Sequence, residues 1–303
     1  MSYKNELLAL CGRLGCECRE NEPLKSHTTF KIGGNAEAVV FINSGESLKE
    51  ILRFLKINNV RCFVIGKGSN ILADDSGFDG VILKIGKDFS EIKLIGDSGI
   101  YCTAGVSLSE VCRFALDNSL AGLEFAYGIP GTAGGGLYMN AGAYGGELKN
   151  VIKSAHFIDS NGAIKEIIAE DMELSYRTSI FAQNKDMIIT DMTFSLQKGD
   201  KAEIKAKMDE LMDKRRTKQP LEYPSAGSTF KRPAGSYASL LIEQCGLKGL
   251  TVGGAQVSEK HSGFVINKGG ATFDDVMKLT KKVQDIVFEK TGFKLELEPI
   301  ILR

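Results

Sequence analysis

The alternation of hydrophobic and polar positions predicts helices in four segments. SLKE at Ser47–Glu50 and SLSE at Ser107–Glu110 each match a capping box, with serine at the N-cap and glutamate three residues later, so a helix is expected after each serine. Ala202–Arg216 reads as a charged helix. Thr272 is expected to cap a longer amphipathic helix, whose apolar residues keep helical spacing until Gly292.

Strands are predicted where β-branched and aromatic residues cluster. Arg61–Ile65 reads as a strand that stops at a glycine-rich loop. The segment AHFIDSNGAIKEI (155–167) predicts a hairpin with an Asn-Gly turn, and MIITDMTFSL (187–196) predicts the next strand. FKLELEPIIL (293–302) is expected to close the chain as a strand. The polar residues 197–201 between these groups predict a domain boundary.

Composition limits the classes of protein that this chain can be. Its 303 residues are 43% hydrophobic, which suggests about two domains with substantial cores. Lys and Arg together number 38, as do Asp and Glu, so no net field favours nucleic acid or an anionic membrane. Neither a signal peptide nor a run of about 20 apolar residues is visible, so a cytoplasmic protein is expected.

Cysteine and histidine give no metal signal. The seven cysteines are an odd number, and Cys11, Cys16 and Cys18 lack C-x-x-C spacing, so reduced structural thiols are expected. Three scattered histidines are too few for a cluster of metal ligands. Chemistry is therefore expected from other side chains or from a bound cofactor.

Two glycine-rich segments are candidates for binding phosphate. Gly66–Asn70 follows a predicted strand, and Gly128–Gly146 contains eight glycines in nineteen residues. Without Cβ atoms, backbone N–H groups can approach a pyrophosphate closely, although tight turns would use glycine equally well. Neither segment matches the Rossmann or P-loop fingerprint. Valine at Gly68 or Gly135 is expected to abolish ligand binding and leave the protein folded.

Five motifs in one order give a more specific signal: VIGKGSNIL, YGIPGTAGGGLYMNAGAYGGEL, YRTSIF, SAGSTFKRP and GAQVSEKHSGFVIN. Together they resemble the UDP-N-acetylenolpyruvoylglucosamine reductase (MurB) family over residues 28–298. The resemblance implies an α+β fold, in which a two-part FAD-binding fold of the vanillyl-alcohol oxidase type precedes an α+β substrate-binding domain. It also implies NADPH-dependent reduction of a UDP-sugar in peptidoglycan synthesis.

The predicted domains follow the motifs along the chain. Residues 1–28 form an N-terminal segment, residues 29–196 form an FAD-binding domain with lobes at about 29–58 and 59–196, and residues 197–303 form a substrate-binding domain. About ten residues separate Arg177 from the next predicted strand, so the chain resembles the short family form without a tyrosine-bearing flap.

The resemblance assigns FAD to both glycine-rich segments. No histidine or cysteine occurs between Gly128 and Gly146, so non-covalent FAD is expected. The implied cofactor-binding residues are Gly66, Lys67, Gly68, Ser69, Asn70, Ile71, Gly128, Ile129, Pro130, Gly131, Thr132, Gly134, Gly135, Asn140, Ala141, Gly142 and Ala143.

Three residues match the catalytic positions of the family. Ser228 matches its proton donor and Arg177 the arginine that binds the enolate oxygens, where a planar bidentate guanidinium suits the role. Glu298 matches the second acid, and Glu296 is expected on the same face of the strand. Pro299 and Ile300 depart from the family pattern after this glutamate. From the residues alone, a turn serine is the alternative role for Ser228, and a structural ion pair is the alternative role for Arg177.

Substrate contacts follow from the same motifs. A UDP-sugar carries a diphosphate that cationic and hydrogen-bonding groups would hold, although Lys231 and Arg232 could equally be solvated surface charge. The implied substrate residues are Tyr144, Tyr176, Gly227, Lys231 and Arg232, with Asn140 as a looser candidate.

Three alternatives remain beside this interpretation. Another FAD-dependent oxidoreductase of the same fold and a flavin-binding module without turnover would share both glycine-rich segments. Ser228-x-x-Lys231 with a later Lys-Thr-Gly resembles serine acylases, but Pro233 would stop the helix that their serine requires. No protein partner can be inferred.

Overall fold

The computed structural model describes residues 3–303. Internal contacts divide the chain into two compact units, and neither is continuous in sequence. Unit 1 comprises Met1–Glu20, Ala38–Lys67 and Gly80–Asp213, and unit 2 comprises Asn21–Glu37, Gly68–Asp79 and Lys214–Arg303. Compact units need not be functional domains, so the boundaries predicted above stay a prediction.

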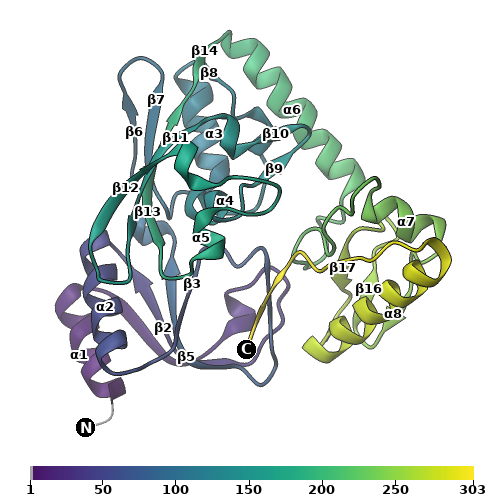
Figure 1. Cartoon of the computed structure of the whole chain (residues 1–303), viewed down its shortest axis with the longest axis horizontal. Coiled ribbons are helices and arrows are strands. Elements are labelled where there is room, and N and C mark those ends of the chain that lie inside the picture. The colour runs from purple at the N-terminus through teal and green to yellow at the C-terminus, as the bar shows by residue number, and fades with distance from the viewer. Residues whose placement is uncertain (1–2) are drawn as a thin grey trace. The chain divides into compact units, whose positions relative to one another are not determined.

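A five-stranded antiparallel sheet is the centre of unit 1 (Figure 1). The expected hairpin forms between β11 and β12, and Gly162 takes the positive φ of 79° that its turn requires. The expected strand at 187–196 is β13. In spatial order the strands are β12 (Ile164–Ile168), β11 (Ile152–Ile158), β13 (Ile188–Ser195), β7 (Gly99–Thr103) and β6 (Ile92–Ile95).

Helices α3 (Leu108–Asp117) and α4 (Ala133–Tyr138) pack against this sheet through β7 and β13. The capping box predicted for α3 is confirmed, because the Ser107 hydroxyl accepts from the Glu110 N–H and the Glu110 carboxylate accepts from the Ser107 N–H. The other helices of this part of the chain are α1 (Tyr3–Leu14), α2 (Gly45–Ile57), α5 (Ile180–Gln183) and α6 (Lys201–Lys218).

The predicted start of α2 is wrong by three residues. Ser44, not Ser47, is the N-cap, and its hydroxyl accepts from the Ser47 N–H at 3.1 Å. Ser47 takes the N3 position and accepts from the Ser44 N–H at 3.2 Å. A serine at N3 therefore completes the capping box here, in place of the usual glutamate.

A four-stranded sheet in the order β1-β2-β5-β3 comprises β1 (Glu17–Pro23), β2 (Asn35–Ile42), β5 (Phe78–Ile85) and β3 (Cys62–Ile65). Strand β3 is the strand expected at Arg61–Ile65, and it lies parallel to β5 with Cys62 opposite Val81. Short pairs complete the pattern: β9 (Gly142–Ala143) with β10 (Gly146–Glu147), and β8 (Leu120–Ala121) with β14 (Gln197–Lys198). 3₁₀ turns occupy Leu24–Ser26, Lys87–Phe89, Glu124–Ala126, Leu148–Asn150 and Ala169–Met172.

Unit 2 packs α7 (Ala238–Gln244) and α8 (Phe273–Thr291) with a three-stranded antiparallel sheet. Thr272 caps α8 and Gly292 ends it at φ 75°, as predicted. The sheet consists of β15 (Thr251–Val252), β16 (Ala255–Val257) and β17 (Val265–Asn267), while β4 (Ile71–Ala73) pairs in parallel with β18 (Ile300–Leu302).

The strand expected over 293–302 is largely wrong. Only Ile300–Leu302 is a strand, and before it a single bridge joins Leu297 to Phe230. Leu295 is buried, whereas Glu296 is exposed. Apolar and charged residues do alternate in this segment, but most of the segment has no neighbouring strand with which to pair.

Each unit has its own hydrophobic core. In unit 1, the fully buried Ile100, Phe181 and Phe194 belong to a cluster that joins the five-stranded sheet to its helices. In unit 2, Leu279 and Val283 of α8 meet Ile242 of α7. Burial on this scale is the main favourable term in folding.

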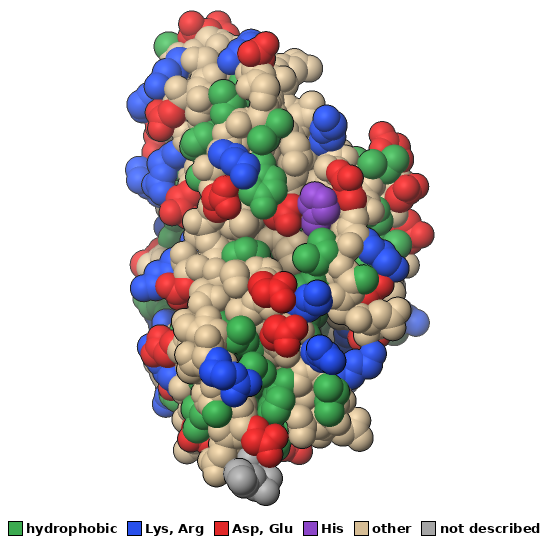
Figure 2. All heavy atoms as spheres, turned by 90° about the vertical axis from the view of Figure 1, so that its left-hand side faces the viewer, with side chains coloured by type: hydrophobic (Ala, Val, Ile, Leu, Met, Phe, Trp, Pro, Cys, Tyr) green, Lys and Arg blue, Asp and Glu red, His purple; other side chains and the backbone are tan. Residues whose placement is uncertain are grey.

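Surface charge is mixed, in keeping with the balanced composition. The face drawn in Figure 2 intersperses acidic and basic side chains, without a patch of one sign. Among residues 3–303, no helix combines the length and apolar composition that a membrane span requires. All seven cysteines are free thiols.

Candidate functional site

The two glycine-rich segments meet inside unit 1. A Cβ placed on Gly66 would lie 2.4 Å from Thr132 Oγ1, so the end of β3 passes directly against the start of α4. Lys67 is the next residue of this loop. Hydrogen bonds from the Ser107 side chain and N–H lower the pKa of Glu110, and the positive charge of Lys67 contributes to the shift.

The glycines of α4 serve two different purposes. A Cβ on Gly134 would lie 2.7 Å from that of Ala104, and one on Gly136 would lie 3.0 Å from Leu148 Cδ1. These two glycines therefore allow the helix to pack closely on its neighbours. Gly135 is exposed, and its added Cβ would meet only the Thr132 hydroxyl, at 3.3 Å. The bare surface at Gly135 is thus the part of α4 open to a ligand.

The N–H groups in the first turn of α4 already have hydrogen-bond partners within the chain. The Ala133 N–H donates to the Val106 carbonyl at 2.7 Å, and the Gly134 N–H donates to the Ala104 carbonyl at 3.0 Å. The Gly135 N–H is capped by Thr132 Oγ1 at 3.2 Å. Because these donors are already satisfied, the turn offers a ligand close approach rather than hydrogen bonds.

Gly68 is required by the fold itself. Its φ is +64°, and an added Cβ would lie 2.2 Å from the His27 carbonyl oxygen, a backbone atom of unit 2. The Gly68→Val variant expected to remain folded would therefore meet backbone in a left-handed conformation. The Gly68→Val variant is therefore expected to lose stability, so Gly135 is the better probe of ligand binding.

A tight turn carries Tyr176 and Arg177. Ser175 and Thr178 exchange N–H···O=C bonds of 3.2 Å, which leaves Tyr176 and Arg177 as the two central residues. Arg177 has φ 57°, a left-handed conformation that costs a residue other than glycine about 1–3 kcal/mol. Its guanidinium carbon lies 5.1 Å from the centre of the 43% exposed Tyr176 ring, and its Nη2 donates weakly to the Gly142 carbonyl at 3.4 Å.

Tyr144 occupies a second tight turn, between β9 and β10. Ala143 pairs with Gly146, and φ is positive at both Tyr144 (52°) and Gly145 (87°), as a type I′ turn requires. The Tyr144 side chain is 45% exposed. Because Gly142 precedes this turn and accepts from Arg177, unit 1 brings Tyr144, Tyr176 and Arg177 to neighbouring turns.

Asn140 differs from its predicted role as a ligand contact. Its side chain is 1% exposed, and its Nδ2 donates to Glu147 Oε2 at 2.8 Å and to the Ser175 carbonyl at 3.0 Å. Its Oδ1 accepts the Lys149 N–H at 2.9 Å. The amide is therefore committed to bonds inside the chain. Glu147 and Lys149 were missed from the sequence, where no local signal marks them.

Ser228 lies in a segment of unit 2 that is neither helix nor strand. Gly227 before it has φ 76°, and Phe230 after it forms the bridge to Leu297. The serine is half-buried. Since neither Ser228 nor Lys231 lies in a helix, the serine-acylase arrangement does not form.

The geometry separates the two candidate glutamates. Glu296 is exposed, with its side chain at 76%, and it pairs with Lys231 Nζ at 3.6 Å. Glu298 is half-buried, and its N–H donates to the carbonyl of Thr229, the residue after Ser228, at 3.0 Å. Glu298 is therefore the carboxylate whose backbone is tied directly beside the candidate serine.

The second half of the first glycine-rich loop joins this group in unit 2. The Thr29 hydroxyl donates to the Ser225 carbonyl at 2.7 Å, and the Thr29 N–H donates to the Gly68 carbonyl at 3.2 Å. Asn70 Nδ2 donates to the Glu298 carbonyl at 3.3 Å. The loop, the serine segment and the glutamate are thus linked by hydrogen bonds whose acceptors are all backbone carbonyls.

Models of two known protein families match this chain. A family model described as "FAD binding domain" matches residues 36–167, and one described as "UDP-N-acetylenolpyruvoylglucosamine reductase, C-terminal domain" matches residues 219–302. A reductase of that name from Clostridium novyi is 48% identical over 93% of this chain and 91% of its own length. Another, from Clostridium tetani, is 46% identical over 99% of this chain and 97% of its own.

The chain belongs to the UDP-N-acetylenolpyruvoylglucosamine reductase family. The crystal structure of the family member from Thermus caldophilus is 32% identical and superposes with a TM-score of 0.81, covering 95% of this chain and 99% of that one. The expected α+β class is confirmed, as is an FAD-binding domain followed by a C-terminal reductase domain. FAD is the cofactor of this reductase-family chain.

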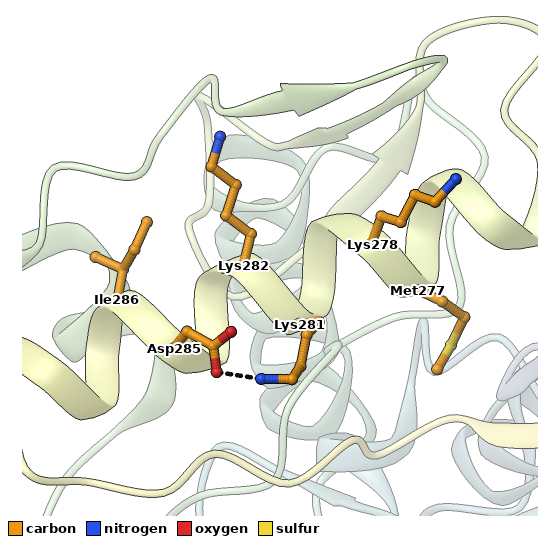
Figure 3. Close-up of a pocket in the computed structure, with 6 residues that line it drawn as sticks. All are labelled: Met277, Lys278, Lys281, Lys282, Asp285 and Ile286. Carbon is orange, nitrogen blue, oxygen red and sulfur yellow. Dashed lines mark hydrogen bonds and ion pairs between the residues drawn. The ribbon is translucent and has the colours of Figure 1, made fainter.

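The bare surface at Gly135 fits a bound FAD, because it leaves exposed backbone without a Cβ atom, whereas the missing Cβ of Gly66 makes room for the Thr132 side chain. A shallow hollow on the outer face of α8 does not belong to this site (Figure 3). It lies over Met277 and Ile286, where Lys281 pairs with Asp285. None of the residues that match reductase-family motifs lines it.

Proposed function

We propose that this chain reduces the enolpyruvyl ether of UDP-N-acetylglucosamine to the lactyl ether of UDP-N-acetylmuramate, in the synthesis of peptidoglycan precursors. The observation that carries this proposal is the 46–48% identity to reductases of that name, which spans both matched domains. When bound, FAD supplies hydride transfer, taking hydride from NADPH and delivering it to the terminal carbon of the double bond.

Arg177 is proposed to hold the substrate carboxylate. Adding hydride to the terminal carbon leaves negative charge on the adjacent carbon and its carboxylate. A guanidinium provides a planar pair of donors for those oxygens. Its backbone is fixed by the Ser175–Thr178 turn, so the positive charge is in place before charge develops.

Ser228 is proposed to donate the proton that completes the reduction. A hydroxyl is a weak acid, so it suits only a strongly basic carbanion and needs its own proton replaced. Glu298 is proposed as the second acid. Its backbone bond to Thr229 supports this choice over Glu296, which is exposed and paired with Lys231.

The remaining predicted residues divide between FAD and the sugar nucleotide. FAD is proposed to be held by Gly66, Lys67, Gly68, Ser69, Asn70, Thr132 and Gly135. Exposed Tyr144 and Tyr176 are proposed to contact substrate. Lys231, Arg232 and Gly227 are proposed to contact it as well, although Lys231 has an ion-pair partner and Arg232 lies 4.4 Å from the centre of the Tyr237 ring.

The cellular setting follows from the proposed chemistry. UDP-sugars and NADPH are made and used in the cytoplasm, so the chain is proposed to act there.

One anaerobic titration tests the proposal and separates its two alternatives. The purified protein should show a flavin spectrum that NADPH bleaches and that the enolpyruvyl sugar nucleotide restores. A flavin that NADPH does not bleach would indicate a binding module without turnover. A flavin that NADPH bleaches but this substrate does not reoxidise would indicate a different FAD-dependent oxidoreductase.

A further inference from the structure

The turn that carries Arg177 is fastened at both ends to the C-terminal end of α4. On one side, the Ser175 carbonyl accepts from Asn140 Nδ2 at 3.0 Å. On the other, the Ser179 hydroxyl donates to the Tyr138 carbonyl at 2.6 Å. These bonds flank the two central residues of the turn. The position of Arg177 is therefore set by α4 and by the residues immediately after it.

Hydrogen bonds within the chain occupy both the nitrogen and the oxygen of the Asn140 side chain. Both hydrogens of its amide nitrogen have acceptors, Glu147 Oε2 and the Ser175 carbonyl, and its oxygen accepts the Lys149 N–H. Its φ of 44° is a conformation that asparagine tolerates better than most residues. At 1% exposure the side chain is shielded from solvent.

Glu147 connects Asn140 to the guanidinium electrostatically. Burial acts to raise its pKa, but hydrogen bonds from Lys149 and Asn140, together with the positive charges of Lys149 and Arg177, lower the pKa below its ordinary value. Lys149 Nζ lies 3.1 Å from Glu147 Oε2. An ionised carboxylate is thus held where it acts on Arg177, and Asn140 holds that carboxylate.

We propose that Asn140 is a positioning residue for Arg177, because one buried carboxamide fixes both the backbone of its turn and the carboxylate that its charge faces. This inference rests on the proposed role of Arg177 in binding the substrate carboxylate. Its side-chain amide is committed to hydrogen bonds within the chain, and it acts by restricting where the guanidinium can lie.

Asn140→Asp isolates the two donor bonds. Aspartate has the same shape and also tolerates positive φ, but it places an acceptor against Glu147 and the Ser175 carbonyl. Asn43→Asp is a matched control in the same unit, because Asn43 Nδ2 likewise donates to two carbonyls, of Leu14 at 3.1 Å and Gly15 at 3.0 Å. Asn140→Gly also permits the backbone conformation and serves if the aspartate variant does not fold.

Hydrogen exchange tests the fastening without relying on activity. The amides of Ser175 and Thr178 bond across the turn, so peptides that cover 175–178 should exchange at least about tenfold faster in Asn140→Asp. In Asn43→Asp they should exchange as in the wild type. Unchanged exchange at 175–178 in a folded Asn140 variant would overturn the inference, whatever the enzyme's substrate.

Half-reaction kinetics then test the link to Arg177. Asn140→Asp should retain flavin and normal bleaching by NADPH but slow reoxidation by the enolpyruvyl substrate by about 10–100-fold, since small misplacements of a positioned group cost that much. In an Arg177→Ala background the same change should cost no more than about twofold. A full, additive loss in that background would show that Asn140 acts independently of Arg177 and would overturn the inference. If the wild-type protein does not react with this substrate, the proposed function is refuted instead. The hydrogen-exchange result would still test whether Asn140 holds the turn at 175–178 in place.

Discussion

Gly135→Val should remove FAD without unfolding the protein. The added Cβ meets only Thr132 Oγ1, at 3.3 Å, and the residue is exposed on α4. Valine is slightly better than glycine in a helix interior, by a few tenths of a kcal/mol, whereas disturbing the Thr132 cap costs about 1 kcal/mol. The free energy of unfolding of the apoprotein should therefore change by less than about 1 kcal/mol.

The effect on the ligand should be larger. Forcing extra carbon atoms into a close-packed contact costs about 1–3 kcal/mol, which corresponds to about 5–150-fold in FAD affinity. The assay is the ratio of flavin to protein absorbance after purification, followed by titration with FAD. Circular dichroism and thermal unfolding monitor the fold.

Variants of two other glycines serve as controls for Gly135→Val. Gly12 is an exposed glycine of α1 with nothing within 4 Å of an added Cβ, so Gly12→Val should retain flavin. Gly134→Val should lose stability, because its Cβ would lie 2.7 Å from the Ala104 Cβ. If Gly135→Val keeps full flavin content and wild-type affinity, the bare surface of α4 does not contact FAD and the reasoning fails.

Three further predictions follow. Acid precipitation should release the flavin to the supernatant, since no histidine or cysteine lies between Gly128 and Gly146; flavin left in the pellet would contradict non-covalent binding. Ser228→Ala should leave bleaching by NADPH normal but slow substrate reoxidation by about 10²–10⁴-fold, while Arg177→Ala should slow the same step and also weaken substrate binding; normal reoxidation in stopped flow would exclude Ser228 as the donor. Thr272→Ala removes the capping bond to the Asp275 N–H and should lower the free energy of unfolding by about 1 kcal/mol, measured by urea denaturation; no change would show that the capping box of α8 adds nothing.

Local signals in the sequence were sufficient where the bonding partner lies within a few residues. The hydroxyls of Ser107 and Thr272 cap their helices by accepting the N–H three residues ahead, and the Asn161-Gly162 hairpin closes on itself. The start of α2 was missed because Ser47 fills a position at which glutamate is the usual signal. The final strand failed for a different reason, since alternation cannot say whether a partner strand is present.

The sequence could not predict that neighbouring glycines have different roles. Gly134, Gly135 and Gly136 are adjacent and chemically identical, yet one faces Ala104, one faces outward and one faces Leu148. The atoms that distinguish them lie about 12 to 30 residues away along the chain. Asn140 was assigned as a ligand contact from the family motif that contains it, and the distances to Glu147 and Ser175 reveal that its amide is already committed.

Unit 2 combines segments that lie far apart in the sequence. The order of residues along the chain therefore does not show which residues hold the first glycine-rich loop. Gly68–Asp79 belongs with the C-terminal residues, because the Ile300 N–H donates to the Asn70 carbonyl at 2.9 Å and Asp75 accepts the Phe273 N–H at 2.6 Å across 198 residues. Hydrogen bonds of that range leave no periodic trace in the sequence. Cutting the chain at the predicted boundary near residue 197 would therefore separate Asn70 from the backbone that positions it, even though every glycine of both segments would remain on one side of the cut.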